Sequence, residues 1–388
     1  MDLDALRGSP IGRLVPISGV DGRTGDSYDA FAFLPEALPR EVDLSSETWN
    51  AVVEASAALG RLDEASRKVP DPSLLTQPSL RREAQSTSAL EGTFAPLEAV
   101  FESEAEHRTA TAEVREVLNY VSTAEEAFKW ISDRPVTRGL IEGLQLSLVR
   151  GTAGELGDAG GLRQIQVFIG PRNSPIDHAR FVPPPPGDRL AAGLDDWIGW
   201  INDPPVALPA VVQAAIAHYQ FETLHPFSDG NGRLGRLLIV VQLMMRELLE
   251  QPILVVSPWF EARRAEYQDE LLRLSQTGEW DCWVRFFAVG VRDSAESNRR
   301  KILRLLTLQE DQIRIVRGAG GFGVAERLAG ELIGSPVLRA SQVAKRHGVS
   351  SQAAMNALRK LADLGILEER RRPGRVIFVA PDVLRELR

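Results

Sequence analysis

Residues 225–236, HPFSDGNGRLGR, carry the densest chemistry of this 388-residue chain, with one histidine, one aspartate, one asparagine, two arginines and three glycines. Pro226 disfavours helical backbone at His225, so a helix ending there is expected. Gly230 and Gly232 flank Asn231 and allow backbone conformations that other residues avoid, and successive amides in such a loop can face one anion. The stretch therefore predicts a helix–loop–helix unit whose loop binds an anion.

The charged residues of this stretch suit phosphate chemistry. A helix beginning near RLGR directs its unpaired N–H groups and its dipole toward an anion, and Arg233 and Arg236 share one helix face from which both can reach phosphates. Asp229 supplies an oxygen of the kind that Mg²⁺ takes beside phosphates, and His225 can serve as a general base. The competing interpretation is a structural turn with a surface network of ion pairs.

Composition excludes several other classes of protein. The net charge of −8 argues against binding of nucleic acid over the whole surface, although a basic subdomain can exist within it. A single cysteine excludes an internal disulfide and any multi-cysteine metal site. The start, MDLDALRGSP, lacks the pattern of a secretion signal, and LLIVVQLMM (237–245) is too short to cross a bilayer. A cytoplasmic protein without a membrane partner is expected.

Apolar periodicity predicts a mainly α-helical chain. Helices are expected over 47–65, from 80 to about 150, and in five further segments between 188 and 315, while PDPSLLTQPSL (70–80) is typical of a proline-rich loop. The stretch RQIQVFIG alternates like a strand, and ARFVPPPP ends in prolines. These features predict a β-hairpin over 161–183 that projects from the helical body.

The end of the chain differs in charge. Residues 339–388 hold 11 Lys or Arg against 5 Asp or Glu, a balance of +6. The order of helix, turn at Gly348, second helix and hairpin around Pro373–Gly374 resembles a winged helix-turn-helix domain, which binds DNA or docks and dimerises proteins. For DNA, the residues expected at bases are Ser351, Gln352 and Asn356, and those at phosphates are Arg359, Lys360, Arg370, Arg371, Arg372 and Arg375.

The 225–236 stretch resembles the signature of Fic-domain proteins, His-x-Phe-x-Asp/Glu-Gly-Asn-Gly-Arg-x-x-Arg, at every defined position. The resemblance implies a helical core that transfers AMP from ATP to a Tyr, Thr or Ser hydroxyl of a target protein, or of itself, and releases pyrophosphate. His225 would take the hydroxyl proton, Asp229 would hold Mg²⁺, and Phe227 would anchor the loop. The expected nucleotide-binding residues of the loop are Asp229, Gly230, Asn231, Gly232, Arg233, Leu234, Gly235 and Arg236.

Three other segments resemble further parts of Fic proteins. STSALEGT (86–93) is similar to the inhibitory motif, in which Thr87 and Glu91 lie on a helix of about 80–92 and Glu91 pairs with Arg236 in place of the ATP γ-phosphate. The hairpin corresponds to the flap that presents the target; an ordinary structural hairpin explains it equally well. SPWFEARRAEYQDEL (257–271) is similar to the segment that covers the adenine. The residues expected to face nucleotide or target here are Val167, Phe168, Ile169, Gly170, Tyr267 and Gln268.

The predicted architecture has three parts: an N-terminal segment (1–94) with the inhibitory helix, a Fic core (95–316) with the flap, and a winged helix-turn-helix domain (324–388). Three alternatives to AMP transfer stay open: transfer of UMP, phosphocholine or another phosphate-linked group, removal of AMP from a modified protein, and a DNA-binding regulator with a vestigial Fic sensor. The sequence also leaves a homodimer open.

Overall fold

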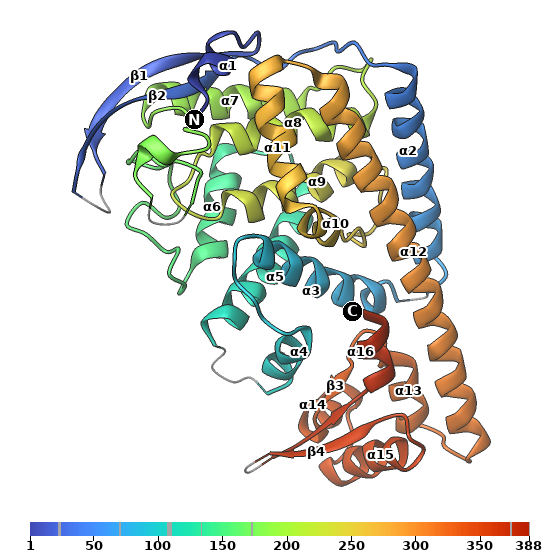
Figure 1. Ribbon diagram of the computed structural model, residues 1–388. Helices are drawn as coiled ribbons and strands as arrows, with labels where there is room; N and C mark the ends of the chain where they lie inside the picture. Colours follow the sequence, from blue (N-terminus) through green and yellow to red (C-terminus); the bar gives the residue numbers. More distant parts are fainter. Residues whose placement is uncertain are drawn as a thin grey trace.

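Figure 1 shows the computed structural model, which describes residues 1–21, 25–69, 71–106, 111–132, 134–171, 174–372 and 375–387, without the side chains of Glu106, Arg372 and Arg375. A large helical body lies above a small C-terminal unit, and one long helix, α12, runs alongside both. The expectation of a mainly α-helical protein is confirmed. Within the described ranges, no helix combines the length and apolarity needed to cross a bilayer.

The described residues of the N-terminal part add two strands and four helices to this body. In chain order they are α1 (Leu3–Arg7), β1 (Gly12–Val20), β2 (Ser27–Pro35), α2 (Ser46–Ser66), α3 (Ser73–Leu90) and α4 (Leu97–Glu106). Strands β1 and β2 pair antiparallel from Gly12–Pro35 to Val20–Ser27. Helix α2 begins where the Ser45 hydroxyl accepts from Thr48 N, and it packs along α12.

In the described residues of the central part, nine elements follow one another. They are α5 (Ala112–Ile131), α6 (Arg138–Val149), η1 (Ile176–His178), α7 (Asp188–Asn202), α8 (Ala210–Leu224), α9 (Asn231–Met245), α10 (Ser257–Ala262), α11 (Arg264–Thr277) and α12 (Trp280–Gly318). Helices α8 and α9 lie in contact inside the body, and nearly all their residues are buried. A helix buried on all sides needs apolar residues around its whole circumference, which explains the continuous apolar run in 237–245. The loop between α8 and α9 is therefore held by two core helices.

The C-terminal unit consists of α13 (Val324–Glu331), β3 (Val337–Leu338), α14 (Ala340–His347), α15 (Ser351–Asp363), β4 (Glu368–Arg372), β5 (Arg375–Val379) and α16 (Pro381–Leu387). Gly348 between α14 and α15 is left-handed (φ 64°), and the strands order as β3-β5-β4. The predicted turn at Pro373–Gly374 lies outside the described residues. This unit contacts α3 through α16 and α4 through β3, and Arg370 pairs with Glu98.

Sequence-based prediction missed one feature of the N-terminal part and was wrong about another. The β1–β2 hairpin was not predicted, and most of the proline-rich loop expected over 70–80 is helix, because α3 begins at Ser73 and contains Pro78. Leu75, Pro78 and Leu80 are buried where α3 packs on α5 and α10. Tertiary burial there overrides the local preference of proline, as packing often does.

The expected flap hairpin over 161–183 is also not regular. The two arms meet at one β-bridge, in which Ile169 N donates to Phe181 O (2.8 Å) and Phe181 N donates to Ile169 O (3.1 Å). Pro171, Pro175 and the prolines of 183–186 carry no N–H group, so they cannot extend the ladder. Arg172 and Asn173 lie outside the described residues.

Candidate active site

The loop at 225–230 joins the C-terminus of α8 to the N-terminus of α9. Its first and last residues have a left-handed backbone conformation. His225 has φ 46° and ψ 59°, and Gly230 has φ 87° and ψ 1°. Positive φ is common for glycine but rare for histidine, and His225 N still donates to Phe221 O (3.0 Å), which closes the last turn of α8. The predicted helix–loop–helix arrangement is therefore present.

Asn231 closes this loop on itself. Its Oδ1 accepts from Phe227 N (2.9 Å), its Nδ2 donates to Phe227 O (2.7 Å), and the Phe227 side chain is buried. Phe227 thus anchors the loop as expected. The Asn231 amide, which the resemblance placed in an anion pocket, makes one hydrogen bond through Oδ1 and one through Nδ2 to the loop backbone.

Arg163, which sequence reasoning missed, supports the same loop from outside the signature. Its Nε donates to His225 O (2.8 Å), its Nη1 to Ile165 O (3.3 Å), and its Nη2 to Pro184 O. The side chain is fully buried, and burial lowers its pKa to about 10 despite the opposing effect of Asp158. No local pattern marks Arg163, because its partners His225 and Pro184 lie 62 and 21 positions away along the chain.

His225 is held in the protonation state that a general base requires. Its Nδ1 lies 3.3 Å from Glu222 O, and because a carbonyl only accepts, the ring proton belongs on Nδ1. Burial, with Arg163 next, lowers the pKa of His225 to about 4. The imidazole is therefore neutral near pH 7, with the lone pair on Nε2, and it lines a cavity.

Arg233 lies between two carboxylates. Its Nη2 donates to Asp229 Oδ1 (2.5 Å) and its Nη1 to Glu116 Oε2 (3.1 Å), and the side chain is only 4% exposed. Its Nε is buried without a partner among the described residues. Glu116, on α5, was not identified from the sequence. Arg233 therefore retains one unused donor beside the loop.

Arg236 is held by the helix that carries the motif of residues 86–93. Its Nε donates to Thr87 Oγ1 (2.7 Å), and its Nη2 donates to Thr87 O (3.1 Å) and to Glu91 Oε1 (2.6 Å). Burial would raise the pKa of Glu91, but Arg236, through its charge and its hydrogen bond, acts with Arg233 and His225 to lower the pKa overall. Glu91 also lies against the backbone of α9, since a Cβ on Gly232 would stand 2.2 Å from its Oε1.

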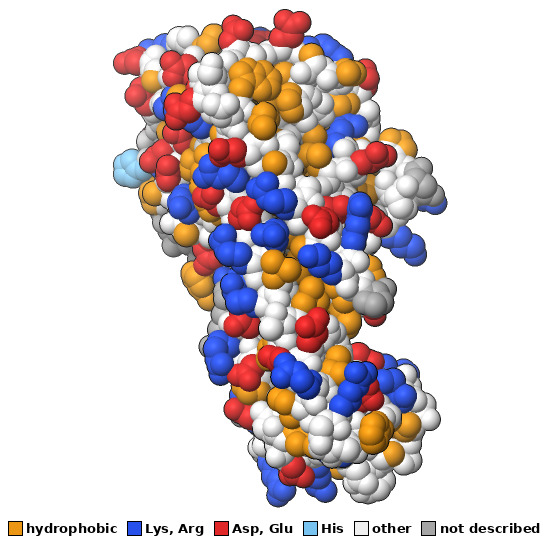
Figure 2. Space-filling view, turned by 90° about the vertical axis from the view of Figure 1, so that its right-hand side faces the viewer, with side chains coloured by type: hydrophobic (Ala, Val, Ile, Leu, Met, Phe, Trp, Pro, Cys, Tyr) orange, Lys and Arg blue, Asp and Glu red, His pale blue; other side chains and the backbone are white. Residues whose placement is uncertain are grey.

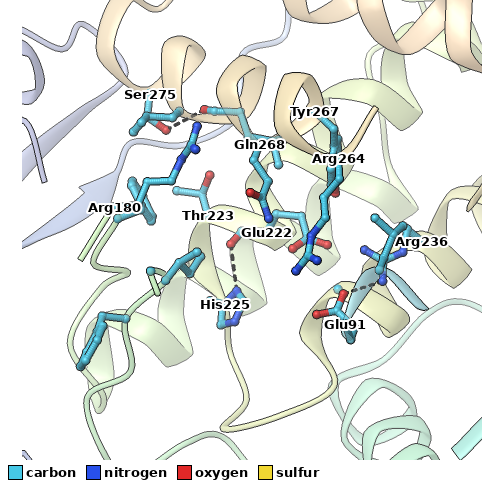
Figure 3. A pocket seen from close by; sticks show the side chains of 18 residues that line it. Glu91, Arg180, Glu222, Thr223, His225, Arg236, Arg264, Tyr267, Gln268 and Ser275 are labelled. Carbon is cyan, nitrogen blue, oxygen red and sulfur yellow. Dashed lines mark hydrogen bonds and ion pairs between the residues drawn. The ribbon is translucent and has the colours of Figure 1, made fainter. Parts of the chain in front are cut away.

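A cavity of about 290 Å³ opens beside His225 and Arg236 (Figure 3). The residues expected from the sequence that line it are Glu91, Phe168, Ile169, Gly170, His225, Gly232, Arg236, Tyr267 and Gln268. Other predicted residues do not line it: Thr87, Val167, Asp229, Gly230, Asn231, Arg233, Leu234 and Gly235. Lining residues that the sequence did not identify include Arg180, Phe181, Glu222, Thr223, Arg264 and Ser275.

Tyr267 belongs more to the core than to the cavity surface. Its side chain is buried, and its hydroxyl lies 2.8 Å from His218 Nε2. The other ring nitrogen of His218 lies 3.2 Å from Gly235 O, and burial lowers the pKa of His218 to about 3. The neutral histidine therefore donates to Gly235 O and accepts from the Tyr267 hydroxyl. These two hydrogen bonds join α8, α9 and α11 beside the cavity.

Asp229 suits a magnesium ion only together with a ligand. The carboxylate side chain is 41% exposed, and its Oδ1 already accepts from Arg233. The described residues contain no cluster of three or more metal-binding side chains. Mg²⁺ commonly takes one or two carboxylates and completes its shell with phosphate and water oxygens, so Asp229 fits that role if phosphates bind beside it.

Two family models match parts of the helical body. The family model described as Fic/DOC family matches residues 140–243, which include the whole 225–236 loop. A second, described as Fic/DOC family N-terminal, matches residues 49–129, which include Thr87 and Glu91. The second match crosses the boundary expected at 94, in agreement with the packing of α3 on α5.

Curated relatives match over the same central region. Protein adenylyltransferase fic-1 of Caenorhabditis briggsae is 36% identical over 132 residues, which are 34% of this chain and 23% of that protein. Protein adenylyltransferase Fic of Culex quinquefasciatus is 33% identical over 132 residues, which are again 34% of this chain and 23% of that protein. The match thus spans less than a quarter of the length of these relatives.

Solved structures extend the likeness of fold beyond that region. A Fic family protein from Desulfovibrio desulfuricans G20 superposes with a TM-score of 0.56 at 21% identity, over 88% of this chain and 98% of that chain. Fic-1 from C. elegans superposes with a TM-score of 0.50 at 21% identity, over 67% of this chain and 73% of that chain. The two family-model matches, which include the complete signature at 225–236, show that the chain carries a Fic domain preceded by the N-terminal region of the Fic/DOC family.

Proposed function

We propose that this protein transfers AMP from ATP to a Tyr, Thr or Ser hydroxyl of a target protein, and to itself, and that Glu91 inhibits the transfer. The observation that carries the proposal is the convergence of three groups at one cavity: a neutral His225, a buried Arg236 and the backbone of Gly232. Relatives named protein adenylyltransferase support the choice of nucleotide and acceptor.

The proposed reaction is a displacement at the α-phosphorus of ATP. The target hydroxyl oxygen forms a bond to the α-phosphorus while the bond from the α-phosphorus to the bridging oxygen breaks, and pyrophosphate leaves with that electron pair. His225 Nε2 takes the hydroxyl proton, which its low pKa permits at neutral pH. Most of the catalytic effect comes from positioning and charge stabilisation, as in other phosphoryl transfers.

The loop supplies the phosphate contacts in this proposal. The N–H groups at the start of α9, behind the left-handed Gly230, have no partners within the helix and favour an anion. Arg233 has a free Nε, and Arg236 becomes available when Glu91 leaves. A magnesium ion held by Asp229 would neutralise phosphate charge.

Inhibition follows from competition for one guanidinium group. Two of the Arg236 nitrogens are bound to Thr87 and Glu91, so a phosphate cannot use them while α3 stays in place. Charge-assisted hydrogen bonds of this kind are stronger than neutral ones. We therefore place the outer phosphates of ATP where the Glu91 carboxylate lies in this structure.

A pair of radiolabels tests the proposal. Glu91→Gly should incorporate label into protein from ATP labelled at the α-phosphorus and none from ATP labelled at the γ-phosphorus, and Glu91→Gly with His225→Ala should incorporate neither. Label retained from the γ-phosphorus would show phosphate transfer instead. Incubation with UTP, CDP-choline and a pre-adenylylated protein separates the alternative reactions, and absence of protein label from every donor would reject the proposal.

A second function is proposed for the C-terminal unit: contact with DNA through α15. Ser351, Gln352, Asn356 and Arg359 are exposed on this helix, and Gln352 and Asn356 share a hydrogen bond of 2.9 Å that bases could replace. Arg370 and Arg371 are partly neutralised by Glu98, Glu368 and Glu369, which lowers the expected affinity. A mobility shift with duplex DNA in dilute salt should show binding that weakens as salt rises, and no shift would reject this contact.

A further inference from the structure

Glu222 is an acidic residue of the cavity that lies outside the family signature. It occupies the last turn of α8, three residues before His225, and its side chain lines the same cavity as Arg236 (Figure 3). Its Oε1 has no exposed surface and no hydrogen-bond partner among the described residues. A buried acceptor left unpaired costs about 1–3 kcal/mol, so the Glu222 carboxyl group would be stabilised by a hydrogen-bond donor that enters the cavity its side chain lines.

The neighbouring helix makes room for this carboxyl group. A Cβ at Gly235 would stand 2.4 Å from Glu222 Oε1, so a larger residue there would force the Glu222 side chain to move. A Cβ at Gly232, one turn earlier on α9, would likewise stand 2.2 Å from Glu91 Oε1. Two glycines of α9 therefore each accommodate one carboxylate, and the Glu222 carboxylate is the one that Arg236 leaves without a hydrogen bond.

The position of Glu222 within the cavity indicates which part of a nucleotide it would meet. The phosphate end is defined by His225, Arg236 and the start of α9, whereas Phe168, Phe181, Leu271 and Leu272 supply apolar surface elsewhere in the cavity. In Figure 3, Glu222 lies between the Glu91–Arg236 pair on one side and Thr223, Arg180 and Ser275 on the other. A nucleotide with its phosphates at Arg236 would therefore place its nucleoside part over Glu222.

Electrostatics favours a neutral partner for this group. Burial raises the pKa of Glu222 to about 7, although Arg236 opposes the rise. An additional negatively charged group would not stabilise a carboxyl group beside a triphosphate. An uncharged donor can stabilise it by donating a hydrogen bond. Adenosine offers three such donors, the two ribose hydroxyls and the exocyclic amine of the base.

We propose that Glu222 is a nucleotide-specificity residue that accepts a hydrogen bond from a donor of the nucleoside. This inference rests on the proposed function, because it takes the cavity to bind ATP. The competing explanation is that Glu222 only balances the charge of Arg236, which would make its removal equally costly for every nucleoside triphosphate.

The test compares dissociation constants measured by isothermal titration calorimetry in the Glu91→Gly protein. The added substitutions are Glu222→Met, which has no oxygen acceptor, and Glu222→Gln, which keeps one. The nucleotides are ATP, 2′-deoxy-ATP, 3′-deoxy-ATP and ITP, in which an oxo group replaces the base amine. Glu222→Met should weaken ATP binding roughly tenfold, the effect of one hydrogen bond of about 1.4 kcal/mol, and Glu222→Gln should weaken it less.

The pattern across nucleotides identifies the donor. If a ribose hydroxyl is the donor, the ATP analogue that lacks this hydroxyl should bind with equal affinity to the Glu91→Gly protein with and without Glu222→Met. If the base amine is the donor, ITP should bind these two proteins with equal affinity. Equal weakening of all four nucleotides, or no weakening of any, would overturn the inference. Binding with this pattern but without label transfer would reject the proposed reaction and keep the role of Glu222, and absence of ATP binding would overturn both.

Discussion

Glu91 Oε1 lies 2.6 Å from Arg236 Nη2, and the two residues are 145 positions apart in the chain. The contact joins the N-terminal region of the family to its signature loop. It also occupies the arginine that the proposed reaction requires for phosphate, so the structure corresponds to the inhibited form in our proposal.

Removing the Glu91 carboxylate should therefore activate the protein. We expect Glu91→Gly to raise self-labelling from α-labelled ATP at least roughly tenfold, since an ion pair of about 1.4 kcal/mol shifts the occupancy of Arg236 by that factor. The matched control is Glu104→Gln, which removes the ion pair between α4 and Arg81 of α3 without touching Arg236. Equal labelling by wild type and Glu91→Gly would contradict the inhibitory role.

Thr87 should contribute a smaller part of the same restraint. Its hydroxyl accepts from Arg236 Nε at 2.7 Å, and Thr87→Val removes that acceptor at nearly constant volume. Loss of one hydrogen bond to a charged group corresponds to about 1.5–3 kcal/mol, but Glu91 remains. We expect Thr87→Val to label itself at a level between the levels of wild type and Glu91→Gly in the same assay. A level below that of wild type would show instead that Thr87 holds Arg236 in the position that catalysis requires.

Arg163 should support both stability and activity, because its guanidinium group binds the carbonyl oxygens of His225, Ile165 and Pro184. Arg163→Lys leaves some of these acceptors unpaired, so we expect the free energy of unfolding to fall by about 2–4 kcal/mol. The control Arg61→Lys alters an exposed pair with Glu296 and should change it by less than about 0.5 kcal/mol. Similar denaturation midpoints for the two variants would refute a supporting role.

The protonation of His225 predicts a particular response to acid. The pKa of His225 is about 4 in the folded protein and 6.5 ordinarily, so the unfolded chain binds the proton first as the pH falls. Stability is therefore lost below about pH 6.5, by roughly 1 kcal/mol at pH 5.5 for this residue. His225→Ala should lose less stability than wild type between pH 7.5 and 5.5 in chemical denaturation. Parallel curves would mean that the folded-state pKa is not depressed.

The sequence predicted the loop well because its chemistry is local. His225, Gly230, Gly232 and Arg236 lie within one turn and one helix start, where spacing determines geometry. Arg163, Glu116 and Glu222 escaped notice because their partners come from distant segments or are absent, and a lone charged residue carries no pattern. The same limit applies to α3, whose Pro78 favours a loop until packing against α5 and α10 is known.

A crystal structure of Glu91→Gly with ATP and magnesium tests the central claim most directly. Our account predicts the triphosphate against Arg236, Arg233 and the first amides of α9, with the α-phosphorus facing His225 Nε2 and the nucleoside over Glu222. A nucleotide bound elsewhere, or an Arg236 that still contacts only Thr87 and α3 while the cavity beside His225 holds no phosphate, would contradict it.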